Sequence, residues 1–392
     1  MKKTLLILLS LMLVISGIAG CGGGGGGDVE EGNKTVYIGI FEPQSGDNGP
    51  GGKQEMLGML YANYLTPTVV IDGETYNVEL IAVDNQSSND KAPSAAQELI
   101  SRGVSVVLGS YGSGVSIAAS PTFADAGVPV IGVTCTNPAV TLGNDHYFRL
   151  VFLDPFQGTV LASHARNTLG ARTAYVLTTQ GDDYSQGLSN FFIEAFGRAN
   201  VIQEFYPPGT SDFSPYIATA RARGADVFMS PTIVGDAQLI IDQIIMQGLT
   251  IPILAGDTWD NNVIVEATRG RNIRLYVSTF YAEGANPEFD AGLKAFINAN
   301  PLARVNNGGT DRIAASTVVG FDAYNVALEA FRRAGTTNSA RVLEALRGVQ
   351  MQGITGFIEF DAIGDRKMDF AFIKRLNTQV GGWDSVGQVF AR

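Results

Sequence analysis

Four loops of this 392-residue sequence carry hydroxyl groups, and each follows a short apolar run. Most of these loops add glycine, an aromatic residue or a carboxylate. They occupy positions 110–114 (SYGSG), 134–138 (TCTNP), 179–184 (TQGDDY) and 256–260 (GDTWD). Hydroxyl and N–H groups suit a carboxylate, and a buried ammonium needs an anion as its partner. Taken singly, each loop has the composition of an ordinary turn. Together they predict a binding site for a small polar molecule.

Other kinds of chemistry are less well supported by the residues. The glycine-rich stretch 109–114 lacks the G-x-G-x-x-G spacing of dinucleotide sites, and the chain has no Walker lysine. His146, in a loop, and His164, in a helical pattern, have no metal-binding spacing, and we expect both to be partly solvated. Cys135 has no histidine in a recognisable constellation, so we interpret it as a buried, inert thiol rather than a nucleophile.

The paired carboxylates Asp182 and Asp183 alternate faces in an extended loop, so a helix cap explains them better than a catalytic pair. We therefore predict no catalytic residue, no metal and no cofactor, and expect a chain that is not an enzyme. The net charge is -11 with no cluster of Lys or Arg, which argues against a nucleic-acid partner.

Short apolar runs alternate with helical patterns twice along the chain, and this order predicts the elements that position the loops. The first unit has expected strands at 36–41, 78–84, 104–109 and 128–133, with helices at 54–65, 91–102 and 116–126 between them. The second unit has expected strands at 173–178, 201–206, 226–230, 251–255 and 275–280, with helices at 156–169, 184–199, 213–223 and 237–247. Helices at 288–298, 313–334 and 339–346 and strands at 356–360 and 369–374 follow. The fold class is α/β, with parallel sheets covered on both faces and ligands expected beyond the carboxyl ends of the strands.

The N-terminus has the pattern of an export signal. Lys2 and Lys3 precede an apolar run at 4–15 that is short for a membrane span, and no second apolar run is long enough to span a bilayer. The run ends in Ile-Ala-Gly-Cys at 18–21, which resembles the bacterial lipobox and implies cleavage before Cys21 and a diacylglycerol on its sulfur. The alternative is an ordinary signal peptide with a chance cysteine. We assign 1–20 as signal peptide and the glycine-rich 21–35 as a lipid-anchored tether.

A series of short motifs then occurs in an order that resembles one known family. They are Ile38-Gly39-Ile40-Phe41, Val83-Asp84-Asn85-Gln86, Thr134–Pro138 after Ala124–Pro129, Phe148-Arg149 with Gln157, Asp182-Asp183-Tyr184 with Gly187, Ser211-Asp212-Phe213, Gly256–Asp260, Gly320–Tyr324 and Gly353–Gly356. The chain is similar to the type I periplasmic binding proteins, in the group of Leu/Ile/Val-binding proteins that serve ABC transporters.

The resemblance implies two doubly wound lobes joined by three crossovers, with a ligand cleft between them. The crossovers would lie near Arg149–Leu153, Ser278–Tyr281 and Gln350–Gly356. Lobe 1 would comprise 36–150 and 282–350, and lobe 2 would comprise 151–281 and 351–392.

The resemblance also implies the site residues. Ser113 and Thr136 would hold the carboxylate of an amino acid, and the carbonyl of Thr134 would face its ammonium. Tyr184 and Asp257, from lobe 2, would complete the head-group site.

Two departures leave the side-chain pocket open. The loop 42–52 contains no aromatic residue, and Ile233 stands where relatives often have a second aromatic group. Tyr111, with Gly112 beside it, and Tyr281 are candidates for lining the pocket, and packing in the core or at the rim is an equal alternative.

The implied function is capture of an amino acid or a related solute outside the cytoplasm, by hinged closure of a membrane-anchored monomer, and delivery to an ABC permease. A ligand-sensing receptor component is the first alternative. A hydrolase acting through Cys135 or the carboxylates is the second.

Overall fold

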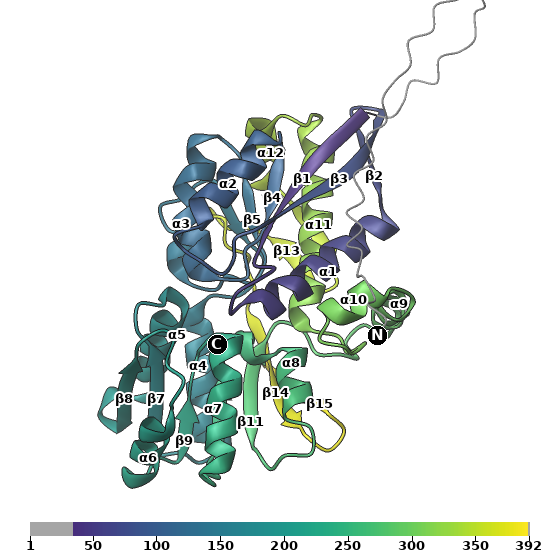
Figure 1. Cartoon of the computed structure of the whole chain (residues 1–392). Helices are drawn as coiled ribbons and strands as arrows, with labels where there is room; N and C mark the ends of the chain where they lie inside the picture. The colour runs from purple at the N-terminus through teal and green to yellow at the C-terminus, as the bar shows by residue number, and fades with distance from the viewer. Residues whose placement is uncertain (1–33, 391–392) are drawn as a thin grey trace, which may run out of the picture. The chain divides into compact units, whose positions relative to one another are not determined.

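The computed structural model describes residues 34–390, so Cys21, the signal segment and most of the tether lie outside the described residues. The described chain forms two α/β lobes, each built on its own sheet (Figure 1). Helices lie on both faces of each sheet, which confirms the predicted fold class.

Lobe 1 contains a six-stranded sheet in the order β2-β3-β1-β4-β5-β6. Its strands are β1 (Lys34–Glu42), β2 (Thr68–Ile71), β3 (Glu74–Asp84), β4 (Val106–Leu108), β5 (Val130–Gly132) and β6 (Tyr147–Arg149). All neighbours are parallel except β2, which pairs antiparallel with β3. Its helices are α1 (Gly49–Leu65), α2 (Ala92–Ser101), α3 (Ser113–Asp125), η1 (Pro138–Val140), α9 (Pro287–Ala299), α10 (Pro301–Asn306), α11 (Ala315–Ala334) and α12 (Ser339–Leu346).

Lobe 2 contains a seven-stranded sheet in the order β15-β14-β11-β10-β9-β7-β8. Its strands are β7 (Ala174–Thr179), β8 (Val201–Tyr206), β9 (Val227–Met229), β10 (Ile253–Ala255), β11 (Leu275–Thr279), β14 (Phe370–Asn377) and β15 (Gly382–Phe390). The last two strands are antiparallel additions at one edge. Its helices are α4 (Asp154–Ser163), the π-helix η2 (His164–Thr168), α5 (Asp183–Phe196), η3 (Arg198–Asn200), α6 (Ser214–Ala222), α7 (Val234–Met246), η4 (Asp257–Trp259) and α8 (Asn262–Ala267).

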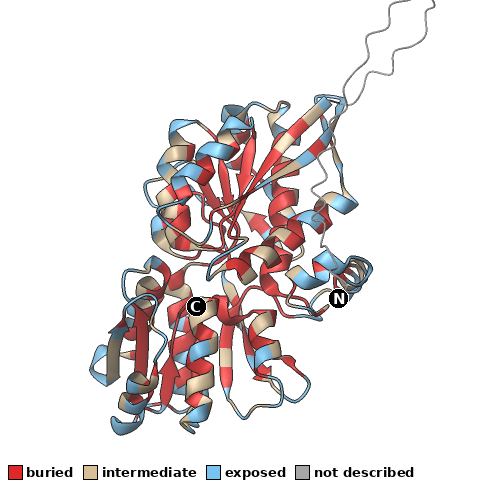
Figure 2. Ribbon diagram, in the orientation of Figure 1, coloured by how far each residue is buried: buried red, intermediate tan, exposed pale blue. Residues whose placement is uncertain are grey.

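The central strands are buried along almost their whole length, as Figure 2 shows in red. In β4, β5 and β10 every residue is buried, because helices cover both faces of a parallel sheet. One core of lobe 1 lies between its sheet and α2 and α3, and the main core of lobe 2 lies between its sheet and α6, α7 and α8. The continuous apolar runs that predicted these strands therefore have a direct physical cause.

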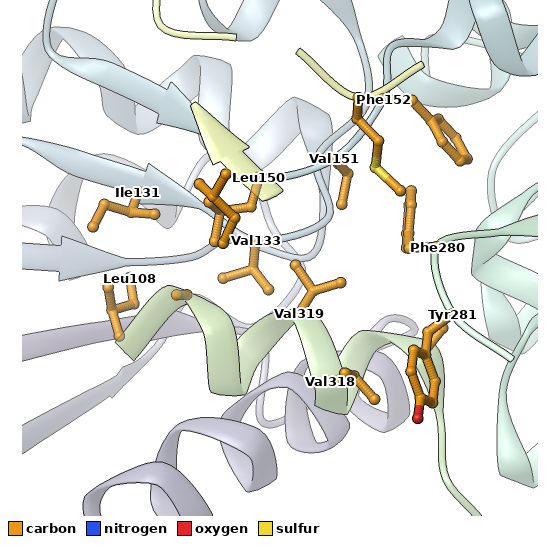
Figure 3. Close-up of a cluster of buried hydrophobic side chains, with 14 of the residues drawn as sticks. Leu108, Ile131, Val133, Leu150, Val151, Phe152, Phe280, Tyr281, Val318 and Val319 are labelled. Carbon is orange, nitrogen blue, oxygen red and sulfur yellow. The ribbon is translucent and has the colours of Figure 1, made fainter. Parts of the chain in front are cut away.

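A third core continues through the places where the chain passes between the lobes. Leu150, Val151 and Phe152 follow β6, and Phe280 and Tyr281 follow β11 (Figure 3). The rings of Phe152 and Phe280 lie with centroids 4.6 Å apart. The crossovers are thus packed segments with apolar side chains of their own.

The third passage follows the hairpin of β12 (Gln350–Gly353) and β13 (Gly356–Glu359). The loop of this hairpin is attached to α11 of lobe 1, because Asp322 accepts hydrogen bonds from the backbone N–H groups of Ile354 and Thr355 at 2.8 and 2.9 Å. The chain enters the lobe 2 sheet at β14. The lobe boundaries inferred from the resemblance stay a prediction.

The structure differs from the sequence-based predictions at two helix starts and at one histidine. Helix α1 begins at Gly49 instead of residue 54, and α3 begins at Ser113 instead of residue 116. His164 is buried against the ring of Tyr276, so the expectation that it is partly solvated was wrong. Burial accordingly lowers the pKa of its imidazole.

Candidate functional site

The four loops identified in the sequence meet where the two lobes face each other. The Tyr111 hydroxyl in lobe 1 donates to the carbonyl oxygen of Thr258 in lobe 2 at 3.1 Å. The side-chain amide of Asn137 donates to the carbonyl of Asp183 at 2.7 Å. All four loops follow the carboxyl ends of parallel strands, where ligands bind in open α/β sheets.

A cavity of about 40 Å³ lies between these loops. Tyr111, Gly112, Ser113 and Tyr184 line it, together with Ile233. Four of the seven predicted ligand-binding residues therefore share one cavity. Its volume is far below the ~300 Å³ at the lower end of small-molecule pockets.

Ser113 is the first residue of α3, and its side chain is almost completely buried. Gly112 precedes it in an extended conformation, so the chain turns from the loop into the helix at this point. The Ser113 hydroxyl oxygen accepts a bond from the backbone N–H of Asn137 at 3.3 Å. The free N–H groups and positive end of a 13-residue helix therefore lie at the cavity, which favours an anionic group.

Thr134 and Thr136 follow β5 and are buried, and neither of them lines the cavity. The hydroxyl of Thr134 donates to the carboxylate of Glu55. The completely buried hydroxyl of Thr136 interacts with the carboxyl of Asp154 and forms no other hydrogen bond within the described chain. Because a hydroxyl can both donate and accept, Thr136 has capacity for one further polar group.

Asp257 approaches from lobe 2 and is also buried. Its Oδ1 accepts bonds from the Gln157 amide at 2.9 Å and from the Tyr184 hydroxyl at 3.1 Å. Asn261 caps α8 with its own side chain, so Asp257 is not the cap of that helix. Burial raises the pKa of Asp257 to about 6. No basic side chain within residues 34–390 forms an ion pair with it.

Tyr184, in the first turn of α5, depends on a close backbone approach. A Cβ atom added at Gly256 would lie 2.1 Å from the Tyr184 hydroxyl. Glycine at this position therefore leaves room for the hydroxyl to reach Asp257. Asp182 accepts from the N–H of Ser185 at 2.7 Å, which confirms the prediction of a helix cap.

Tyr111 occupies the side of lobe 1 where the loop 42–52 has no aromatic residue. A Cβ atom at Gly51 would lie 2.3 Å from Cζ of the Tyr111 ring, so the ring fills the space beside this glycine. Tyr281, the other aromatic candidate, lies elsewhere. Its hydroxyl donates to Asp290 at 2.8 Å, and it does not line the cavity.

Two buried glutamates next to the site were not identified from the sequence. Glu42 ends β1, and its Oε2 accepts from the backbone N–H of Tyr111 at 2.8 Å. Glu55 lies on α1 and contacts Thr134. Burial raises the pKa of both carboxyls, that of Glu55 to about 8. Reading the loop after the first strand as the other loops were read would have found Glu42, whereas no local pattern marks Glu55.

Asp154 and Gln157, on the first turn of α4, also belong to this environment. The Asp154 carboxyl interacts with the Thr136 hydroxyl and has no other partner within the described residues, and burial raises its pKa to about 8. The Gln157 amide donates to Asp257 and to the Ser278 hydroxyl, while its Oε1 has no partner. The sequence motif included Gln157 but assigned it no role.

The remaining candidates have structural positions. Cys135 is completely buried, as predicted, and burial raises the pKa of its thiol to about 12. Within residues 34–390 no group of three or more His, Cys, Asp or Glu side chains has the arrangement of a metal site. None of the helices in that part of the chain has the length and hydrophobicity needed to cross a bilayer.

Comparison with known proteins agrees with this architecture. A family model described as "Periplasmic binding protein" matches residues 35–377. A curated relative from Pseudomonas aeruginosa, named "Amino acid binding protein", is 27% identical over 340 residues, which cover 85% of this chain and 88% of the relative.

Solved structures show the same fold. A leucine binding protein from Thermotoga maritima superposes with a TM-score of 0.80 at 30% identity, covering 91% of this chain and 99% of the other. A branched-chain amino acid transporter substrate binding protein from Streptococcus pneumoniae, solved with isoleucine, superposes with a TM-score of 0.78 at 22% identity. This match covers 91% of this chain and 99% of the other.

Proposed function

Because this chain belongs to the periplasmic binding protein family, we propose that it captures an amino acid or amino-acid-like solute between its lobes and delivers it to an ABC importer. The observation that carries the proposal is a polarity across the cleft. The N-terminus of α3, with Ser113, lies on one side, and the unpaired carboxylate of Asp257 lies on the other. An α-amino acid has the complementary pair of charges.

At the carboxylate end, Ser113 and Thr136 supply hydroxyl donors from two neighbouring loops of lobe 1. The first N–H groups of α3 have no carbonyl partner inside the helix and add further donors. The buried Thr136 hydroxyl interacts only with Asp154, and its capacity for a further hydrogen bond supports this assignment.

At the ammonium end, Asp257 supplies the negative charge, and Tyr184 and the carbonyl of Thr134 supply further acceptors. A ligand without a cation would leave Asp257 buried and unpaired, at a cost of several kcal/mol. The site chemistry therefore favours an amino acid over a simple carboxylic acid.

The small size of the cavity supports hinged closure as part of the proposal. A space of about 40 Å³ between loops that already bond to one another corresponds to a closed cleft. The interlobe bonds of Tyr111 and Asn137 would break on opening and form again around the ligand. Hinge and shear motions of this kind are a common response to ligands.

The proposal extends to the delivery of the solute and to the membrane anchor. The family implies a location outside the cytoplasm, and we propose attachment through Cys21 to a membrane that contains the permease. Cell fractionation of a Cys21→Ser variant tests the anchor, since release from membranes is expected. A Ser variant that stays membrane-bound through its N-terminus would contradict it.

A ligand screen of the mature protein tests the central claim. Thermal shift should find stabilisation by amino acids, because a ligand at 100 times its Kd adds about 2.7 kcal/mol to the free energy of unfolding. The matched comparison is each amino acid against its deaminated 2-hydroxy or 2-keto acid. Stabilisation by the deaminated acids alone would overturn the amino-acid proposal and leave the fold intact.

A further inference from the structure

The side of the cleft formed by lobe 1 holds two carboxyl groups that no cation compensates. Glu42 and Glu55 are completely buried and lie within hydrogen-bond reach of each other. One oxygen of Glu42 accepts the Tyr111 N–H, and one oxygen of Glu55 accepts the Thr134 hydroxyl. Apart from the other glutamate of the pair, the second oxygen of each has no donor within residues 34–390. Two carboxylates this close cannot both ionise without a cation.

This glutamate pair, Glu42 with Glu55, adjoins the proposed amino-acid site. Tyr111 connects the two, because its N–H contacts Glu42 while its ring lines the cavity and its hydroxyl reaches lobe 2. Thr134 connects them a second time through Glu55. Asp257 is near enough to Glu55 for its negative charge to raise the pKa of that carboxyl.

A neutral group in the same region also has unused hydrogen-bonding capacity. The Oε1 atom of Gln157 is buried without a partner, although the amide nitrogen of the same side chain bonds Asp257. An unused acceptor beside uncompensated carboxyl groups is the environment that N–H donors on a cation would satisfy.

The buried basic side chains of residues 34–390 are engaged elsewhere. Arg149 bonds Asp365, Arg366 bonds Thr355 and backbone carbonyls, and Lys374 bonds Asp260. None of them forms an ion pair with the glutamate pair. The compensating charge must therefore come from protons or from the ligand.

We propose that the solute is a basic amino acid, whose side-chain guanidinium or ammonium binds the glutamate pair. This inference rests on the proposed function, because Ser113 and Thr136 hold the α-carboxylate and Asp257 the α-ammonium of the same molecule. The ligand then has two positive groups and one negative group, in line with the excess of acidic side chains around the cleft. Arg and Lys side chains are the right class because they supply several N–H donors on a flexible stem.

Binding has a defined proton balance. Before binding, one proton is shared by the glutamate pair. When the ligand cation arrives, the O–H bond of the protonated carboxyl breaks and the proton passes to the buffer. Two carboxylates and one cation remain, with hydrogen bonds from the ligand N–H groups. The proposal thus predicts that a proton is released when the basic ligand binds.

Calorimetry of the mature protein with matched ligands tests the inference. L-arginine is compared with L-citrulline, which replaces the guanidinium by a neutral group of similar shape, and L-lysine with L-norleucine. The charged member of at least one pair should bind roughly tenfold or more tightly, because it makes charge-assisted bonds that the neutral member cannot. Titration in buffers of different ionisation enthalpy should show proton release for that charged ligand only.

The Glu42→Gln variant localises the effect. It should reduce the preference for the charged ligand roughly tenfold or more. The matched control is Glu344→Gln, a substitution of an exposed glutamate on α12, which should keep the full preference. If Glu42→Gln does not fold, the comparison of paired ligands with the natural protein still decides the question.

The outcomes separate the two proposals. If citrulline and norleucine bind as tightly as arginine and lysine or more tightly, the cation site is wrong and the amino-acid function stands. If no amino acid binds and a deaminated acid does, both proposals fail. A preference for charged ligands that Glu42→Gln leaves unchanged would also overturn the role of the glutamate pair.

Discussion

Buried charges occur in two regions of this molecule, at the crossovers and in the cleft, and their surroundings differ. At the crossovers Arg149 donates to Asp365 at 2.6 and 2.8 Å and to the carbonyl of Asn137 at 2.6 Å. Lys374 bonds Asp260 at 2.8 Å, and Thr279 donates to the same carboxylate. In each of these networks a buried charge has an opposite charge beside it.

In the cleft, by contrast, four buried carboxyl groups have no such partner. They are Glu42, Glu55, Asp154 and Asp257. Burying an uncompensated charge opposes folding, so the pKa values of these carboxyl groups are raised unless a ligand supplies the opposite charge. The crossover charges therefore stabilise the fold itself, whereas the cleft carboxyl groups gain an opposite charge only when another molecule binds. Substitutions in the two regions should therefore affect different properties.

The largest expected effect is at the crossovers. Arg149→Met should lower the free energy of unfolding by about 3–5 kcal/mol, because Asp365 is left buried and unpaired. Chemical denaturation measures this loss. Arg341→Met is the control, since Arg341 forms an exposed pair with Glu344 and should cost about 1 kcal/mol or less. Equal losses in the two variants would show that the crossover network is not a structural element.

The next effect is on ligand affinity, in the cleft. Asp257→Asn should weaken amino-acid binding by about 2–5 kcal/mol, because the ligand ammonium loses its anion. Calorimetry measures this change, and thermal unfolding checks that the fold is retained. The control is Asp242→Asn on α7, which removes a partly exposed ion pair with Arg271 outside the cavity. If Asp257→Asn binds amino acids as well as the natural protein, the assignment of the ammonium end fails.

A smaller effect is expected at the carboxylate end. Ser113→Ala and Thr136→Ala should each weaken binding by about 1.5–3 kcal/mol, the contribution of a hydrogen bond to a charged group. Ser94→Ala on α2 removes an exposed hydroxyl and should have no effect on affinity. Natural affinity in both Ser113→Ala and Thr136→Ala would exclude these hydroxyls from the site.

The sequence predicted the alternating strands and helices and the site loops better than it predicted the buried carboxyl groups of the cleft. The strand β8 (Val201–Tyr206) and the helix α12 (Ser339–Leu346) have the predicted bounds, because their patterns are local. The edge strands β2 and β15 were missed, since an edge strand is covered less completely and lacks a continuous apolar run.

The candidate site shows the same limit. Ser113, Tyr111 and Tyr184 follow strands or begin helices, so loop composition and the family resemblance located them at the cavity. Glu55 reaches its neighbours from the interior of α1, and its contact with Thr134 spans 79 positions of the sequence. Whether a buried carboxylate lies beside a cation depends on such contacts between residues that are far apart in the sequence. No local pattern carries that information.

The last prediction uses pH to separate the two regions. Glu55 and Asp154 have raised pKa values of about 8, above their ordinary values of 4.5 and 3.8. The folded protein thus holds protons that the unfolded chain has lost at neutral pH. The stability associated with these groups is fully present below their ordinary pKa values and is lost as pH rises through about 8. The pKa of His164 is lowered, so its contribution to stability has the opposite sign. It reduces the free energy of unfolding as pH falls below about 6.5.

The free energy of unfolding of the unliganded protein should therefore decrease between pH 6.5 and 8, by up to about 1.4 kcal/mol per pH unit for each proton released. Thermal melting at a series of pH values measures this decrease. Glu42→Gln should make this dependence shallower, because a neutral amide replaces one member of the glutamate pair. Arg341→Met, far from any unpaired carboxylate, should keep the natural slope. A basic amino acid that supplies the missing cation should also flatten the dependence. Stability that is constant or rises over this range would contradict the assignment of uncompensated charge to the cleft.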